Sequence, residues 1–132
     1  MDARLRALSA QLRKMTSEDA ATWLMETYPV HGDYADAVDL LAHRSWKRPD
    51  QIRLARHYLS KMPFAGPKVY EAFASFMSFD LLLKILDECW PRASSDADLA
   101  MYYVRRVLER SAKNESDREL IGNFVASKTV SC

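Results

Sequence analysis

Hydrophobic residues recur at helical spacing along almost the whole chain. In the first segment, one face collects Leu5, Leu8, Leu12 and Met15. No segment shows the sustained alternation of hydrophobic and polar residues that a half-buried strand requires. Only 3 glycines interrupt the pattern in 132 residues. The pattern therefore predicts an all-α protein with seven or eight short antiparallel helices, arranged as a miniature solenoid or as a compact helical bundle.

Capping residues and prolines indicate where these helices begin and end. Thr16 and Asp19 have the spacing of a capping pair, and Pro49 lies where a first-turn proline belongs. Ser95 and Asp98 form a second capping pair, and the last helix is expected to be capped by Asn114 or by the serine two residues later. Residues 1–126 are therefore expected to form a single helical domain. Residues 127–132 are expected to form a flexible C-terminal tail.

Two segments of the chain resemble each other. Residues 36–46 read DAVDLLAHRSW and residues 80–90 read DLLLKILDECW, so that Trp46 aligns with Trp90. The match continues through the following helices with small changes of offset, which suggests repeat-like units at about 33–77 and 78–126. The alternative is that any two amphipathic helices can be slid along each other until their leucines coincide.

An all-helical period of about 45 residues resembles the HEAT and armadillo class of helical repeats. The resemblance covers about residues 33–126 and depends on the period and on the phase of the apolar residues, because the chain contains no signature motif of the class. It implies a short curved stack of antiparallel helices, with a concave groove that receives a partner. A compact bundle of the same helices is the alternative architecture.

Composition limits which cellular compartment and which kinds of partner are expected for the protein. The 19 basic and 18 acidic residues leave a net charge of +1, which gives no overall attraction to nucleic acid or to a membrane. Cys89 and Cys132 form no disulfide framework, and the N-terminal segment has no hydrophobic core of a secretory signal. No apolar run is long enough to span a membrane. We therefore expect a cytoplasmic protein without membrane contact.

Signatures of enzymes are absent from the sequence. Glycines at positions 32, 66 and 122 cannot form a dinucleotide-binding or phosphate-binding glycine motif. His31, His43 and His57 lie far apart, with no cysteine at zinc spacing. Cys89 falls in the apolar phase of its helix and is expected to be a structural thiol rather than a nucleophile. We expect no catalytic residue, metal or cofactor, and an unrecognised enzyme is the third hypothesis.

The distribution of charge suggests a binding surface. Residues 16–41 contain six acids and no lysine or arginine, whereas residues 43–70 contain seven bases and one acid. Arg53, Arg56 and His57 follow the spacing of one exposed helical face. This basic strip is either a solvated face, a docking surface for an acidic protein, or a phosphate-binding surface.

The leading hypothesis is a non-enzymatic protein–protein interaction module. Such a protein could be an adaptor or an inhibitor of a cognate protein, for example an immunity protein that neutralises a toxin. The candidate partner-binding residues are Arg53, Arg56, His57, Tyr58, Lys61, Tyr102 and Arg106. The alternative hypothesis is binding of a nucleic-acid backbone by the strip at 44–61, with the candidate residues Arg44, Lys47, Arg48, Arg53 and Arg56.

Overall fold

The computed structural model describes residues 2–129, and within this range the chain forms eight α-helices and no strand. The helices are α1 (Ala3–Lys14), α2 (Ser17–Thr27), α3 (Ala35–Leu41), α4 (Arg48–Leu59), α5 (Lys68–Ala74), α6 (Phe79–Glu88), α7 (Ser94–Ser111) and α8 (Glu115–Thr129). The predicted all-α class is confirmed, and the number of helices agrees with the prediction.

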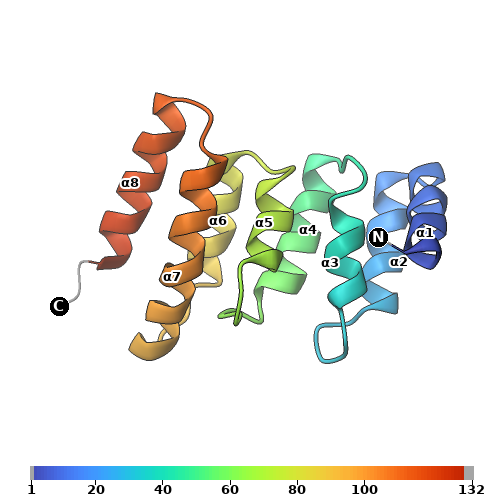
Figure 1. The fold of residues 1–132 in the computed structure, drawn as a ribbon, viewed down its shortest axis with the longest axis horizontal. Coiled ribbons are helices and arrows are strands. Elements are labelled where there is room, and N and C mark those ends of the chain that lie inside the picture. Colours follow the sequence, from blue (N-terminus) through green and yellow to red (C-terminus); the bar gives the residue numbers. More distant parts are fainter. Residues whose placement is uncertain (1, 130–132) are drawn as a thin grey trace.

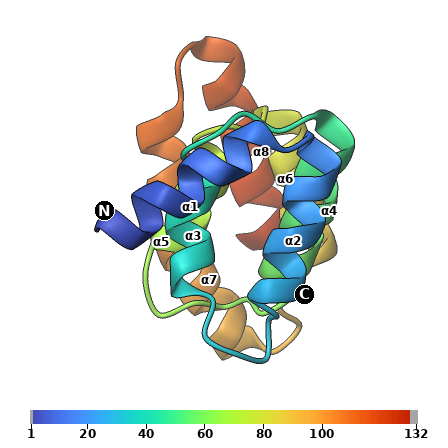
Figure 2. The same ribbon diagram turned by 90° about the vertical axis from the view of Figure 1, so that its right-hand side faces the viewer.

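The helices are arranged in two rows (Figure 1). The odd-numbered helices pack on one another in the order α1, α3, α5, α7, and the even-numbered helices pack in the order α2, α4, α6, α8. Consecutive helices run in opposite directions, so all helices of one row run the same way. Figure 2 views the stack from the end formed by α1 and α2. The opposite end is formed by α7 and α8.

The hydrophobic core lies between the two rows. Each helix contributes residues from the face that meets the other row, including the fully buried Leu24, Leu54 and Phe73. Trp46, in the segment between α3 and α4, is also buried, and its Nε1 donates a 3.0 Å hydrogen bond to the carbonyl of Leu41. Helices in the middle of a row are therefore covered on several sides, and only their outermost faces meet solvent.

The predicted helix starts are confirmed at α2 and α8, where a capping side chain accepts a hydrogen bond from a backbone amide of the first turn. The hydroxyl of Thr16 accepts a 3.1 Å hydrogen bond from the amide of Asp19, and Asn114 accepts one of 2.9 Å from the amide of Asp117. Pro49 lies in the first turn of α4. The capping role predicted for Ser95 is wrong, because α7 begins one residue earlier and its N-cap, Ala93, offers no side-chain oxygen.

The predicted boundary of the C-terminal tail is also wrong, because α8 continues past Ala126 to Thr129. Lys128 explains this extension. Its ammonium group forms an ion pair with Asp87 of α6 and lies 5.7 Å from the ring centroid of Trp90. These contacts attach the last turn of α8 to α6. Residues 130–132, the rest of the predicted tail, lie outside the described residues.

In the part of the chain that the structure describes, no helix combines the length and the apolar character needed to cross a membrane.

Candidate functional site

Arg53, the first of the candidate residues on α4, is engaged within the fold. Its guanidinium donates hydrogen bonds of 3.0 Å to the carboxylate of Asp50 and 2.7 Å to the hydroxyl of Thr22 on α2. The side chain of Asp50 is only 7% exposed, so Arg53 neutralises a buried charge. The residue therefore connects α4 to α2, and the connection leaves its donors less available to a partner.

Arg56 binds the other neighbouring helix of its row, α6. It forms two parallel hydrogen bonds, of 2.9 and 3.0 Å, with the carboxylate of Glu88 on α6. Arg56 lowers the pKa of Glu88, chiefly through these hydrogen bonds. Both side chains remain exposed, and an exposed ion pair of this kind exchanges readily with a competing charge. Arg56 remains accessible to a partner, but only in competition with Glu88.

Tyr58, which was predicted to bind a partner, is fully buried and is therefore not available at the surface. Its hydroxyl donates to the carbonyl of Tyr28, and burial raises the pKa of its phenol. His57 is half-buried, with its ring 4.6 Å from the ring of Tyr58. Burial lowers the pKa of His57, which favours the neutral imidazole. Neither residue presents a charged group at the surface.

Some of the phosphate-binding candidates also bond within the fold, and others are exposed. Arg44 donates hydrogen bonds of 2.6 and 3.2 Å to the carbonyls of Leu12 and Met15, at the C-terminal end of α1. Its guanidinium also lies 4.7 Å from the ring centroid of Trp46. Arg44 therefore acts as a cap for α1.

Lys47 and Arg48, in contrast, are exposed at the start of α4, and Lys61 is exposed beyond its end. The two ends of this helix lie about 18 Å apart, given the rise of roughly 1.5 Å per residue. The strip at 44–61 therefore does not form one continuous surface of free cations.

The remaining candidates, Tyr102 and Arg106, are brought together on α7. The guanidinium of Arg106 stacks over the ring of Tyr102 at 3.9 Å from its centroid, and the ring of Tyr103 meets Tyr102 edge to face at 5.0 Å. Tyr102 is 51% exposed and Leu99, one turn earlier, is 39% exposed. We call the exposed surface of Leu99, Tyr102 and Arg106 the α7 face. It lies in the odd row, whereas the candidates on α4 lie in the even row.

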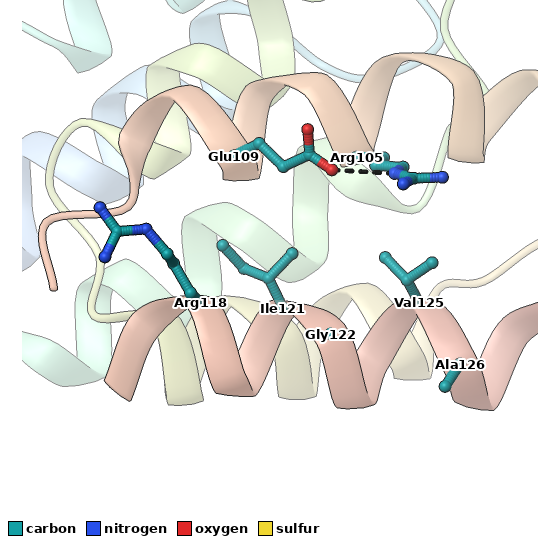
Figure 3. Close-up of a pocket in the computed structure, with 7 residues that line it drawn as sticks. All are labelled: Arg105, Glu109, Arg118, Ile121, Gly122, Val125 and Ala126. Carbon is teal, nitrogen blue, oxygen red and sulfur yellow. Dashed lines mark hydrogen bonds and ion pairs between the residues drawn. The ribbon is translucent and has the colours of Figure 1, made fainter. Parts of the chain in front are cut away.

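A groove of about 510 Å³ lies between α7 and α8, next to the α7 face. Figure 3 shows Arg105 and Glu109 on the α7 side, and Ile121 and Val125 on the α8 side. Arg105 and Glu109 form an ion pair of 2.8 Å, and both side chains are more than half exposed. We call this feature the terminal groove, because it lies at the end of the stack. A smaller hollow of about 450 Å³ shares Arg105 and Glu109 and extends to Tyr102.

Sequence reasoning did not identify the terminal groove. In the sequence, Arg105 is one of three arginines in the second half of its helix, where cations favour the helix dipole, and nothing marks it as part of a groove. The one local signal was Gly122, a glycine in the middle of a helix and on the wall of the groove. The groove itself depends on the pairing of α7 with α8, which no single helical pattern reveals.

The described residues show no metal-binding cluster, since no three histidine, cysteine or acidic side chains gather within residues 2–129. Cys89 is half-buried at the end of α6, and burial raises the pKa of its thiol. A raised pKa keeps the sulfur protonated and so reduces its reactivity at neutral pH. The other cysteine of the chain, Cys132, lies outside the described residues.

Within residues 2–129, the fold and the site define an all-α protein of eight helices, whose exposed large hydrophobic residues and an interhelical groove of about 510 Å³ lie on the last helical pair. Comparison with known proteins adds no family to this description: no protein-family model, no curated protein and no solved structure matches the chain.

Proposed function

We propose that the protein is a non-enzymatic protein–protein interaction module that binds its partner through the α7 face. The observation that carries the proposal is the position of Leu99 and Tyr102. They are the exposed large hydrophobic residues of the described chain, and both lie on α7. Side chains of this size usually serve as anchors when they gather on one surface instead of being scattered.

The chemistry of the α7 face supports the same conclusion. Tyrosine and arginine are over-represented among the residues that contribute most to binding energy. The stacking of Arg106 on Tyr102 holds both side chains in place before a partner arrives, which lowers the entropy lost on binding. Arg105 and Arg110 lie with Arg106 in the C-terminal half of the helix, residues 103–111, where Glu109 is the one acidic residue. A partner with an acidic surface therefore fits best.

The helix arrangement supports a short stack of helical pairs, in the manner of HEAT and armadillo proteins. Buried residues recur at equivalent places in successive odd helices, with a spacing of about 32 residues: Leu5, Ala37 and Val69 are one such set. This spacing corresponds to two helices, and it is shorter than the roughly 40 to 47 residues of HEAT and armadillo units. Stacks of this kind present extended surfaces to proteins.

The offset of 44 residues in the sequence relates different elements. It aligns Asp36 of α3 with Asp80 of α6, and these helices belong to opposite rows. We therefore take the helical pair, rather than a unit of three helices, as the repeating element of the proposed stack.

Binding of a nucleic-acid backbone is the alternative, and the intramolecular bonds of its candidate residues weigh against it. Arg44, Arg53 and Arg56 each direct donors at acceptors within the fold. Lys47 and Arg48 are exposed at the start of α4, and Arg56 is exposed but paired with Glu88. A phosphate ligand would have to displace existing hydrogen bonds to reach Arg44, Arg53 or Arg56.

The proposal is tested by affinity capture from a lysate of the producing organism, with and without nuclease. We expect one dominant partner that resists nuclease, binds saturably when purified, and is lost with the Tyr102→Ala/Arg106→Ala double variant. The matched control is Arg6→Ala, which removes an exposed cation of α1 that belongs to none of the candidate sites. A partner that disappears with nuclease would favour the nucleic-acid hypothesis. Equal capture by the double variant would show that the α7 face is not the binding surface.

A further inference from the structure

The terminal groove occupies a position that an α-helix fills elsewhere in the same molecule. In the preceding helical pair, α7 packs on α5, and its buried side chains also approach α6, so that α7 covers the equivalent position between α5 and α6. There Val104 and Leu108 of α7 are fully buried, close to Tyr70 of α5 and Leu82 of α6. The pair α7 and α8 is the last one within residues 2–129, and no helix of this range lies on its groove. The architecture therefore indicates that the natural occupant is a helix.

The walls of the terminal groove differ from those of the groove that α7 fills. Counted from the first residue of each helix, Arg118 and Gly122 of α8 stand where Leu82 and Leu86 stand in α6. Leu82 and Leu86 are buried, whereas Arg118 and Gly122 are exposed. A helix bound in the terminal groove would thus contact the charged Arg118 and the open space at Gly122. At the corresponding positions of α6, α7 lies close to two leucines.

Gly122 is the residue that most needs an explanation. A glycine in a helix interior costs roughly 1 kcal/mol relative to alanine. A Cβ atom added at Gly122 would have no neighbour within 4 Å, so no contact inside the protein requires the missing side chain. A glycine wall instead permits the close approach of another backbone. Ala126, one turn further along α8, also lines the groove with a small side chain.

The charged residues of the groove select the chemistry of the occupant. Figure 3 shows Arg118 and Arg105 towards opposite ends of the groove, with Ile121 between them. Arg105 lies opposite Val125, which is seven residues, or about 10 Å along the helix, from Arg118. The one carboxylate of the groove, Glu109, is already paired with Arg105.

An incoming helix matches these positions if it has carboxylates about seven residues apart, which is two helical turns. Small or apolar residues between the carboxylates would then face Ile121. The carboxylates would meet Arg118 and Arg105, because the exposed ion pairs that these arginines form within the protein are weak.

A second copy of the chain is a poor match for the groove. Continuing the odd row with another molecule would place its α1 on the terminal groove. That helix contains Arg4, Arg6, Arg13 and Lys14, and it contains no acidic residue. Like charges would therefore face each other across the contact. The groove is better matched by an acidic helix from a different protein.

We infer that the terminal groove binds an acidic amphipathic helix of a partner protein, with carboxylates about two turns apart and small or apolar residues between them. The inference rests on the proposed function, since it identifies the structural class of the partner segment that the interaction module receives.

The test is a selection of single-helix peptides, displayed on phage with a randomised face, against the full-length protein. Enriched peptides are synthesised and their affinities measured by fluorescence anisotropy for three variants. Gly122→Leu fills the groove, and Arg118→Glu reverses its charge. Arg6→Glu reverses an exposed charge on α1, at the other end of the stack, and is the control. We expect Gly122→Leu and Arg118→Glu to weaken binding at least tenfold, and Arg6→Glu to change it less than twofold.

Circular dichroism verifies that each variant is folded, and Gly122→Leu is expected to fold because open space surrounds position 122. The inference is overturned if no peptide is enriched over an unrelated helical protein, if the enriched peptides are basic, or if Gly122→Leu binds them as tightly as the original chain. A dimer seen by analytical ultracentrifugation and abolished by Gly122→Leu would identify a second copy as the occupant, which also overturns it.

The same variants separate this inference from the proposed function. A captured partner that is lost with Tyr102→Ala/Arg106→Ala but retained by Gly122→Leu would preserve the interaction module and refute the role of the groove. Peptides that bind in the groove while no cellular protein is captured would refute the proposed use of the α7 face. The two experiments therefore distinguish a failure of the inference about the groove from a failure of the proposed function.

Discussion

The hydroxyl of Tyr58 on α4 donates a 3.0 Å hydrogen bond to the backbone carbonyl of Tyr28, the residue that follows the last turn of α2. A second contact, of 3.3 Å, reaches the carbonyl of Leu24 in the same turn. Carbonyl groups at the end of a helix lack partners within the helix. Tyr58 supplies that partner from the neighbouring helix, so one buried phenol both fills the core and caps α2.

Removing the Tyr58 hydroxyl should therefore destabilise the fold. Tyr58→Phe keeps the ring but leaves the part-buried carbonyl of Tyr28 without this donor, which costs about 1–3 kcal/mol. Urea unfolding followed by circular dichroism measures the change. The matched control is Tyr102→Phe, whose exposed hydroxyl should change the free energy of unfolding by less than about 0.5 kcal/mol. Equal effects of the two substitutions would contradict the capping role.

Buried tyrosines should also make the fold sensitive to alkaline pH. Burial raises the pKa of Tyr70 to about 12, and it raises that of Tyr58 as well, above the value of roughly 10 in an unfolded chain. Between these values the unfolded state releases protons that the folded state retains, so stability is complete below about pH 10 and falls as pH rises further.

Urea unfolding at several values between pH 8 and pH 11.5 measures this fall. Tyr70→Phe removes one titrating group, and we expect a shallower decline for this variant above pH 10. The variant also loses the hydrogen bond that the hydroxyl of Tyr70 accepts from the amide of Phe64, so the slopes are compared and not the absolute stabilities. Identical slopes would mean that Tyr70 does not contribute to the alkaline sensitivity.

Arg44 should behave as a structural residue. Arg44→Ala removes the two hydrogen bonds to the carbonyls at the end of α1 and the stacking on Trp46, and we expect a loss of about 1–2 kcal/mol in unfolding free energy. Arg48→Ala is the control, because Arg48 is exposed at the start of α4. A phosphate-binding role for Arg44 would give the opposite pattern: unchanged stability, with reduced and salt-dependent affinity for DNA.

The sequence predicted those features of the fold that depend on neighbouring residues. Thr16 caps α2 and Pro49 starts α4, because each acts through the backbone of its own first turn. Tyr58 was placed wrongly for a different reason. Its helix lies between α2 and α6 and also packs on α5, so its buried face is wider than that of a helix with one covered side. A single helical pattern does not show how many sides of a helix are covered.

The candidate site was predicted only in part for a related reason. Tyr102 and Arg106 are four residues apart in one helix, and their contact follows from local geometry. The bonds of Arg53 to Thr22 and of Arg56 to Glu88 join residues about thirty positions apart. The sequence alone therefore left three interpretations of the basic strip open, where the structure shows two connections between helices.

Substitutions of Gly122 test whether the glycine is required for the stability of the fold or for a function of the terminal groove. Gly122→Ala should raise the free energy of unfolding by roughly 0.5–1 kcal/mol, since alanine favours the helix and its methyl group would meet nothing within 4 Å. Ala126→Gly, on the same wall of the groove, should lower it by a similar amount. Urea unfolding of both variants provides the comparison. A loss of stability in Gly122→Ala would mean that the added methyl group meets a neighbour, and hence that the groove is closed in solution. A gain would show that the fold does not need glycine at this position, which leaves the approach of another backbone as the reason for it.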